Sequence, residues 1–251
     1  MSPITISLFV FACVFGAALL GIFIHSLLPD HHMASDTKDV VRLGMGLVAT
    51  MVALVLGLLI ASSKGFYDSQ NTGVTQMAAN VVLLDRILAH YGPEANAART
   101  LLRNSVAHQV ETSWPQDGSG KTRYQLSEDR SEDLLDAIHE LSPVTDSQKT
   151  LKSQALAVAI QIGQTRLLMI EQRTASVPTA LLAMLIFWLG LLFASFGLFA
   201  RPNITLVVSL LLAAVAVSGA IFLIVEMYRP YGGLIRVSDA PLRAAIAQLG
   251  K

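Results

Sequence analysis

LVVSLLLAAVAVSGAIFLIV, residues 206–225, contains no ionisable side chain and runs directly into EMYRPYGGLIRVSDAPLR, residues 226–243. At about 1.5 Å rise per residue, about 20 apolar residues cross the roughly 30 Å hydrocarbon layer of a bilayer. Three further apolar runs have the necessary length. Within lipid the backbone must satisfy its own hydrogen bonds, so all four runs are predicted to be transmembrane helices. Their predicted bounds are residues 4–28, 43–63, 179–200 and 204–225.

The composition agrees with a membrane protein. Of the 251 residues, 53% are hydrophobic and only 14% are charged, whereas soluble domains carry about a quarter charged residues. The formal net charge is zero, and no basic block indicates a nucleic-acid partner. Cys13 is the only cysteine, so neither a disulfide framework nor a thiolate metal site is expected within one chain. The first apolar run lacks a basic segment before it and is too long for a cleaved signal, so we expect it to be retained.

Lysine and arginine are distributed unevenly between the segments that join the spans. Residues 64–177 and the tail after residue 225 hold most of them, whereas few lie before residue 43 or between the last two spans. Short basic segments next to membrane helices stay in the cytoplasm. The asymmetry predicts that both termini and the middle segment lie in the cytoplasm.

The middle segment shows a helical pattern. Val74, Met77, Val81, Leu84 and Leu88 recur at spacings of three and four, as on one face of a helix. Further helices are predicted on both sides of a polar loop at residues 115–121, and no strand pattern occurs. The predicted fold class is therefore all-α. Its expected parts are spans within residues 1–63, a helical cytoplasmic domain at 64–177, spans within 178–225 and a C-terminal strap at 226–251.

The sequence carries little that indicates catalysis. It contains none of the common hydrolase, nucleotide-binding or zinc-protease motifs, and we predict neither an enzyme nor a cofactor. His31 and His32 are adjacent in a short loop, where solvated side chains are favoured over a metal site. An acidic run includes Glu128, Asp129 and Asp133; acids at a helix start are favoured there over calcium binding. No metal site is predicted.

The second apolar span has one continuous face of small residues. The spacings are three and four along the helix, and the face ends in a lysine; its members are Gly46, Thr50, Ala53, Gly57, Ala61 and Lys64. Small residues allow close helix packing in membranes, which is one interpretation. The other is a narrow pore wall with a positive charge at its cytoplasmic mouth. Helix two alone favours packing; we take the six residues as candidate pore-lining positions because of the resemblance described next.

The tail resembles the signature of a bacterial membrane family usually labelled bestrophin-like. Its members end their last membrane helix with an acid, then R-P-aromatic-x-G-x-I-R-[IV]-S and P-L-R. The positions that carry the resemblance here, with two at the end of helix two, are Tyr67, Asp68, Glu226, Arg229, Pro230, Tyr231, Gly233, Arg236, Ser238, Pro241 and Arg243. The order of two spans, cytoplasmic helices and two spans fits the family over the full chain.

This family is distantly similar to the bestrophins, which are pentameric anion channels with four membrane helices per subunit. The resemblance implies a homo-oligomer in the inner (plasma) membrane of a bacterium, with a pentamer favoured, that conducts inorganic anions through a path lined by the second span. The alternative is a non-conducting membrane scaffold or sensor whose cytoplasmic helices bind a partner.

The tail itself has two interpretations. Pro230 and the following glycines break the last helix, and the apolar Ile235, Val237 and Leu242 then require cover. This favours an ordered, mostly extended strap on the cytoplasmic helices, with a helix only at residues 240–249, over a disordered basic tail at the lipid surface. The acids expected to pair with its arginines are Asp68, Asp85 or Glu171.

Overall fold

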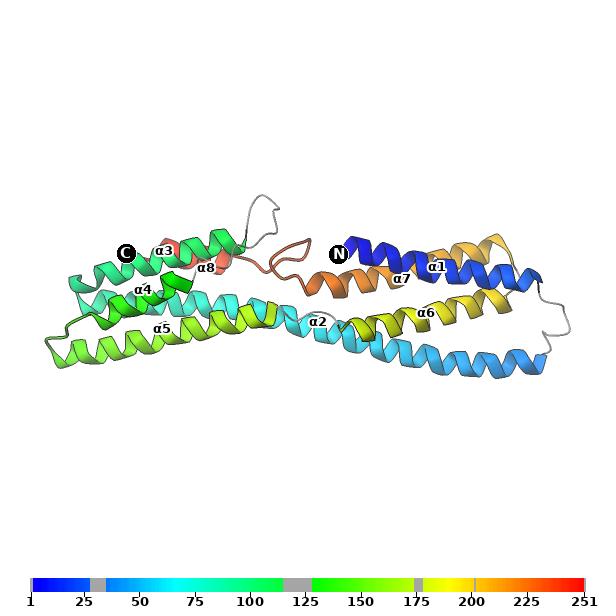
Figure 1. Cartoon of the computed structure of the whole chain (residues 1–251), viewed down its shortest axis with the longest axis horizontal. Coiled ribbons are helices and arrows are strands. Elements are labelled where there is room, and N and C mark those ends of the chain that lie inside the picture. The colour runs from blue at the N-terminus through cyan, green and yellow to red at the C-terminus, as the bar shows by residue number, and fades with distance from the viewer. Residues whose placement is uncertain (1, 28–34, 115–127, 174–177, 201, 251) are drawn as a thin grey trace. The chain divides into compact units, whose positions relative to one another are not determined.

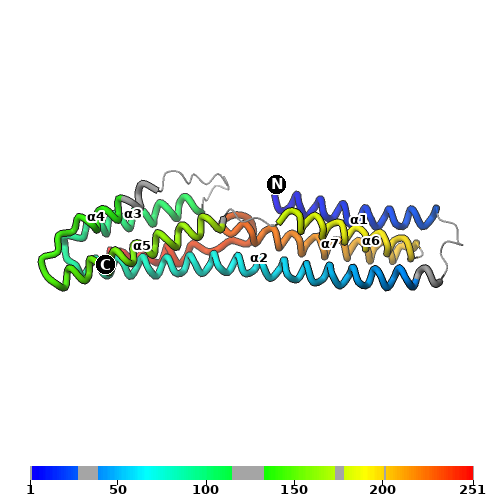
Figure 2. Tube along the Cα trace, turned by 60° about the horizontal axis from the view of Figure 1, so that its bottom comes forward, coloured from blue at the N-terminus to red at the C-terminus, as the bar shows by residue number. Residues whose placement is uncertain are grey.

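The computed structural model describes residues 2–27, 35–114, 128–173, 178–200 and 202–250. All regular secondary structure within these residues is helical, which confirms the predicted all-α class (Figure 1). The chain divides into two compact units. Unit 1 comprises residues 1–66 and 176–228, and unit 2 comprises residues 67–175 and 229–251. Helix α2 (Ser35–Tyr91) is one helix of 57 residues that contributes to both units (Figure 2).

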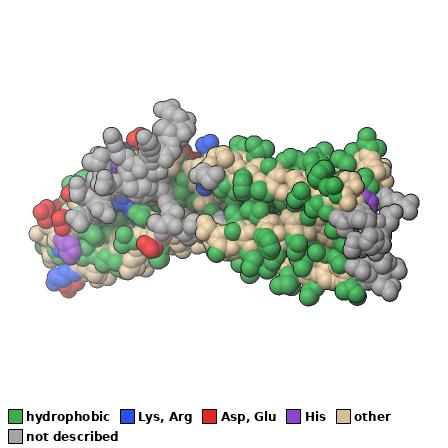
Figure 3. All heavy atoms as spheres, turned by 45° about the vertical axis from the view of Figure 1, so that its right-hand side comes forward, with side chains coloured by type: hydrophobic (Ala, Val, Ile, Leu, Met, Phe, Trp, Pro, Cys, Tyr) green, Lys and Arg blue, Asp and Glu red, His purple; other side chains and the backbone are tan. Residues whose placement is uncertain are grey.

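Within its described residues, unit 1 contains four helices that are long and apolar enough to cross a membrane. They are α1 (Pro3–Leu27), the first part of α2, α6 (Thr179–Phe199) and α7 (Ile204–Met227). The four predicted long apolar helices are thus confirmed. Large apolar side chains such as Leu8, Phe187 and Leu212 are exposed on their surface, and Figure 3 shows apolar side chains (green) over these helices. Such a surface requires an apolar solvent, as a lipid bilayer provides.

Helix α1 packs against α6 and α7, and two glycines bring α1 and α6 into close contact. A Cβ on Gly21 would overlap the carbonyl oxygen of Ala194, and a Cβ on Gly197 would overlap that of Ala18. Small residues let the backbones of two membrane helices approach closely. Near the end of α1, Nδ1 of His25 is hydrogen bonded to the carbonyl oxygen of Leu198 at 2.8 Å. These contacts fix the α1–α6 pair.

Unit 2 is built around the second part of α2. With it pack α3 (Asn96–Ser113), α4 (Glu128–His139), α5 (Asp146–Arg173) and α8 (Ala240–Gln248). The five apolar positions predicted on one face of α2, residues 74, 77, 81, 84 and 88, are all fully buried in the core of this unit. The helical period therefore identified the core face correctly.

A glycine at the end of α2 and a lysine after α4 stabilise the connections between the helices of unit 2. Gly92 has φ 131°, a backbone conformation that favours glycine, and it ends α2 before the 3-10 turn Pro93–Ala95. After α4, the Lys152 ammonium donates to the carbonyl oxygens of His139 and Leu141 at 2.7 and 2.8 Å. A cation at this position satisfies the unpaired carbonyls at a helix C-terminus. The connection between α5 and α6 includes residues outside those described.

Candidate functional site

The predicted small-residue stripe lies on the outer face of α2 in unit 1. All six side chains, from Gly46 to Lys64, are exposed, whereas Val52, Leu59 and Ser63 face inward and are buried. A Cβ placed on Gly46 or Gly57 would have no atom within 4 Å. Within the described chain, neither glycine of the stripe is therefore in close contact with another helix, and Gly46 lines a groove that α2 forms with α6 and α7.

The surroundings of the stripe are mostly apolar. The Thr50 hydroxyl donates to the carbonyl of Leu47 at 2.7 Å, so its donor is satisfied within the helix. Beside the stripe on the outer face, Leu43, Leu54 and Leu58 are exposed by 65–78%. The outer face of α2 thus carries the small-residue stripe and, beside it, a row of exposed leucines that we call the leucine ridge (Leu43, Leu54 and Leu58).

At its other end, the part of α2 in unit 1 is fastened to α7. The rings of Phe66 and Tyr228 stack with centroids 5.0 Å apart, and the Tyr228 hydroxyl lies 3.3 Å from Oγ of Ser62. The family-motif acid Glu226 is only 2% exposed, near the end of α7, and it has an interaction partner. These contacts position the end of the stripe relative to the last apolar helix.

The tail that follows α7 packs on unit 2. The amide of Val237 donates to the carbonyl of Pro230 at 2.7 Å and closes a compact loop. Both residues are buried. At position 233 of this loop glycine has φ 89°, and Nε of Arg236 donates to its carbonyl. The expectation that Val237 and Leu242 find cover is confirmed, while Ile235 is half-buried.

Polar side chains fasten this loop to three helices. The Tyr231 hydroxyl donates to Oε1 of Gln70 on α2 at 2.7 Å, and Nε2 of Gln70 donates to Oε1 of Gln172 on α5 at 2.7 Å. From the end of α3, the Trp114 indole donates to the carbonyl of Val237 at 2.8 Å and packs edge-on against the ring of Tyr231. This network is partly buried and centred on the buried Gln70, and because each member has a partner it favours one arrangement of the loop.

Further family-motif residues support the same arrangement. The Tyr67 hydroxyl donates to the carbonyl of Arg236 at 3.1 Å. Ser238 accepts from the amide of residue 240, and Pro241 occupies the first turn of α8, where its missing amide hydrogen costs nothing. Arg243 pairs with Asp239 one turn earlier. The motif at 230–243 is thus largely occupied in holding the tail in place.

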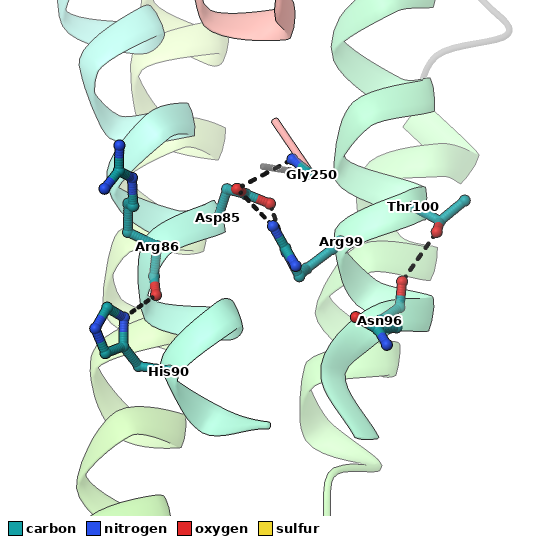
Figure 4. Close-up of polar contacts among 7 residues, drawn as sticks. All are labelled: Asp85, Arg86, His90, Asn96, Arg99, Thr100 and Gly250. Atoms are coloured by element: carbon teal, nitrogen blue, oxygen red, sulfur yellow. Dashed lines mark hydrogen bonds and ion pairs between the residues drawn. The ribbon is translucent and has the colours of Figure 1, made fainter. Parts of the chain in front are cut away.

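An ion pair fixes the far end of the tail (Figure 4). Asp85 of α2 is 3% exposed and accepts from Nε and Nη2 of Arg99 on α3 at 2.7 and 3.0 Å. The amide of Gly250 approaches the same carboxylate at 3.4 Å. The hydrogen bonds from Arg99 to Asp85 raise the pKa of the guanidinium. The prediction that Asp85 pairs with a tail arginine is wrong, because Arg99 occupies both carboxylate oxygens.

Some site residues could not be recognised from the sequence. Gln70, Trp114 and Gln172 were not singled out, since a single glutamine or tryptophan near a helix end carries no periodic signal. In the described residues no group of three or more acidic, histidine or cysteine side chains is arranged to hold a metal ion. His31 and His32 lie outside those residues, as do the side chains at 128 and 129.

The chain is similar to known proteins in sequence and in fold. The model of a family described as Bestrophin-like domain matches residues 12–242. A crystal structure of a mutant bacterial bestrophin homolog from Klebsiella pneumoniae aligns with a TM-score of 0.62 and 15% identity, over 96% of this chain and 97% of that one. A crystal structure of a mutant membrane protein aligns with a TM-score of 0.65 and 14% identity, over 97% of each chain. Comparison with curated proteins gave no significant match. At these identities the structural likeness is one of fold.

Proposed function

Because the chain belongs to the bestrophin-like family, we propose that it assembles into a homo-oligomeric ion channel whose path is lined by the outer face of α2. The observation that carries this proposal is the exposure of the small-residue stripe. A Cβ added at Gly46 or Gly57 would meet no atom within 4 Å, so these glycines are not needed for close packing within the chain. Gly21 and Gly197, by contrast, lie in close helix contacts. The stripe is therefore available to a central path or to a neighbouring subunit.

We assign the conducted species as inorganic anions. The stripe ends at Lys64, which is exposed and lies one residue beyond the predicted apolar span. A ring of ammonium groups at a pore mouth, one from each subunit, attracts anions and repels cations. A pentamer is the proposed assembly, because the bestrophins, to which the bestrophin-like family is distantly similar, are pentamers.

The proposed setting is a bacterial inner membrane, with unit 2 and both termini in the cytoplasm. In a Cys13→Ala background, a cysteine at Ser147, which is exposed on α5, is expected to resist an impermeant maleimide applied to intact spheroplasts. A cysteine at Ser26, near the end of α1, is expected to react. The reverse labelling pattern would overturn this orientation.

Chloride flux from liposomes that contain purified oligomer tests the channel proposal. Ala53→Phe places a bulky ring on the stripe in every subunit and is expected to abolish flux. Leu58→Phe is the matched control: Leu58 is exposed on the same helix but lies on the leucine ridge, so the variant is expected to conduct. Oligomer yield is measured for each variant, so that lost assembly is distinguished from a blocked path.

The same assay addresses the second candidate function. If intact wild-type oligomers pass no more chloride than empty liposomes across the tested voltages and calcium concentrations, the channel proposal fails. The non-conducting scaffold or sensor, with the helices of unit 2 as the partner-binding part, then takes its place.

A further inference from the structure

A groove of about 490 Å³ lies in unit 1 beside the first turns of the apolar part of α2. Arg42, Gly46 and Ala49 of α2 line it, together with Phe199 of α6 and Leu206 of α7; Ser195 of α6 also faces it. Gly46 is thus shared with the small-residue stripe, at the end of the stripe nearest Arg42. Its volume falls within the range of about 300–1,000 Å³ that is usual for sites of small organic ligands. The groove thus has the size of a ligand site.

The ends of the helices place the groove at the edge of the apolar layer. Helix α6 ends at Phe199 and α7 begins at Ile204, so their connecting turn is adjacent. On α2, Arg42 immediately precedes the charge-free run that begins at Leu43. An arginine at this depth extends its guanidinium toward the lipid head groups while its methylene groups cover apolar surface.

The walls and the rim of the groove differ in chemistry. The walls are mainly aliphatic and aromatic, and Ser195, a residue that is 8% exposed, adds a hydroxyl. At the rim, Arg42 pairs with Asp39 at 3.5 Å, the one ion pair of Arg42 among the described side chains, and both side chains are about two-thirds exposed. An exposed pair at this distance is weak, so the guanidinium retains donors for another anion.

We propose that this groove binds one anionic phospholipid per subunit, with an acyl chain against Phe199 and Leu206 and the phosphate on Arg42. Guanidinium binds phosphate through two parallel charge-assisted hydrogen bonds. The apolar walls offer nothing to a free phosphate ion but cover an acyl chain, so the occupant is a lipid. This inference does not depend on conduction through α2.

Native mass spectrometry of the delipidated oligomer, after titration with lipids that share the same acyl chains, tests the proposal. Phosphatidylglycerol is expected to be retained at one molecule per subunit, more tightly than phosphatidylcholine. Arg42→Gln is expected to weaken phosphatidylglycerol retention roughly tenfold, as for the loss of hydrogen bonds to a charged group. Phosphatidylcholine has the same phosphate, but its choline cation opposes binding beside an arginine, so its retention is expected to fall less. Arg86→Gln, which replaces an exposed arginine in unit 2, is the control and is expected to have no effect.

Two further measurements distinguish a lipid in the groove from a second copy of the chain or a free phosphate compound. Ala49→Leu narrows the groove and is expected to reduce retention of both lipids without changing the number of subunits. If the subunit number changes while lipid retention does not, the groove is covered by a second copy of the chain and the proposal is overturned. It is also overturned if glycerophosphate competes as well as the lipid, or if Arg42→Gln preserves the preference for phosphatidylglycerol.

Discussion

The Tyr231 hydroxyl donates a 2.7 Å hydrogen bond to Oε1 of Gln70, a side chain that is completely buried in unit 2. This contact joins the tail to the middle of α2 across 161 positions of sequence. Since Nε2 of Gln70 is already bonded to Gln172, Tyr231 supplies the partner for the remaining polar atom of a buried amide. The aromatic position of the tail motif is thus explained by satisfaction of a buried polar group.

Tyr231→Phe tests this explanation. The change preserves the ring that packs against Trp114 but leaves Oε1 of Gln70 without its donor. We expect a loss of about 1–3 kcal/mol, the cost of an unsatisfied buried acceptor, seen as a lower thermal unfolding midpoint in detergent. Tyr228→Phe is the control, because its hydroxyl makes only an exposed contact of 3.3 Å. Equal midpoints for the two variants would contradict the role given to Tyr231.

Asp85→Asn is expected to cost more. It breaks a pair in which the side chains of Asp85 and Arg99 are only 5% and 17% exposed, and breaking a buried pair costs about 3–5 kcal/mol. Asp146→Asn removes a pair with Lys149 whose side chains are 96% and 63% exposed, so it is expected to cost less than about 1 kcal/mol. Chemical denaturation of the two variants measures the difference.

The pH dependence of this pair follows from Arg99. Its pKa is raised in the folded protein by the hydrogen bonds to Asp85, so the stabilisation from the pair is fully present below the unfolded pKa of arginine, which lies far above neutral pH. That stabilisation is lost only as the pH rises through the still higher folded pKa. The difference in the free energy of unfolding between wild type and Asp85→Asn is therefore expected to stay constant across the neutral pH range. A difference that falls between mildly acidic and mildly basic pH would show that another group controls the site.

Gly197→Ala tests the close contact between α1 and α6. The added methyl would meet the carbonyl of Ala18 and lie 2.8 Å from the amide nitrogen of Ile22, so the helices must separate. Overpacking of this kind costs about 1–3 kcal/mol, seen as a lower thermal midpoint. Gly16→Ala on α1 meets nothing within 4 Å and is expected to be neutral. Similar midpoints for both variants would contradict a glycine-dependent contact.

The fold could be predicted further than the site. Hydropathy and length identified the four apolar helices, because a bilayer allows no other local structure for such runs. Periodicity identified the core face of α2 in unit 2. The continuity of α2 from Ser35 to Tyr91 was not predicted, since Lys64 and Gly65 look like the end of a span although they remain helical.

The site depends on partners that are distant in sequence. The proline and glycine residues at the start of the tail correctly indicated a packed segment, in which Val237 and Leu242 are buried. It did not indicate Gln70 or Trp114, because hydrogen bonds between segments more than 100 residues apart leave no local pattern. Charge alone offered Asp85 as one of three acids for the tail arginines, whereas Arg99 lies nearer along the chain and donates to both carboxylate oxygens.

Lys64→Glu tests the proposed selectivity. It replaces one positive charge with one negative charge per subunit at the end of the stripe, so the reversal potential in a chloride gradient is expected to shift toward cation preference. Lys149→Glu makes the same charge change at an exposed position of α5 and is expected to leave the reversal potential unchanged. Equal shifts in both variants would attribute selectivity to the overall charge and not to Lys64.

Thiol modification of the outer face of α2 tests the central claim most directly. Single cysteines replace Ala53 on the stripe or Leu58 on the leucine ridge, in a Cys13→Ala background, and chloride currents are recorded in planar bilayers. A charged methanethiosulfonate reagent is expected to block the Ala53→Cys channel rapidly, because the reagent enters a path lined by the stripe, and to leave the Leu58→Cys current unchanged. Currents that persist in modified Ala53→Cys while Leu58→Cys is blocked, or oligomers that carry no current at all, would contradict the account.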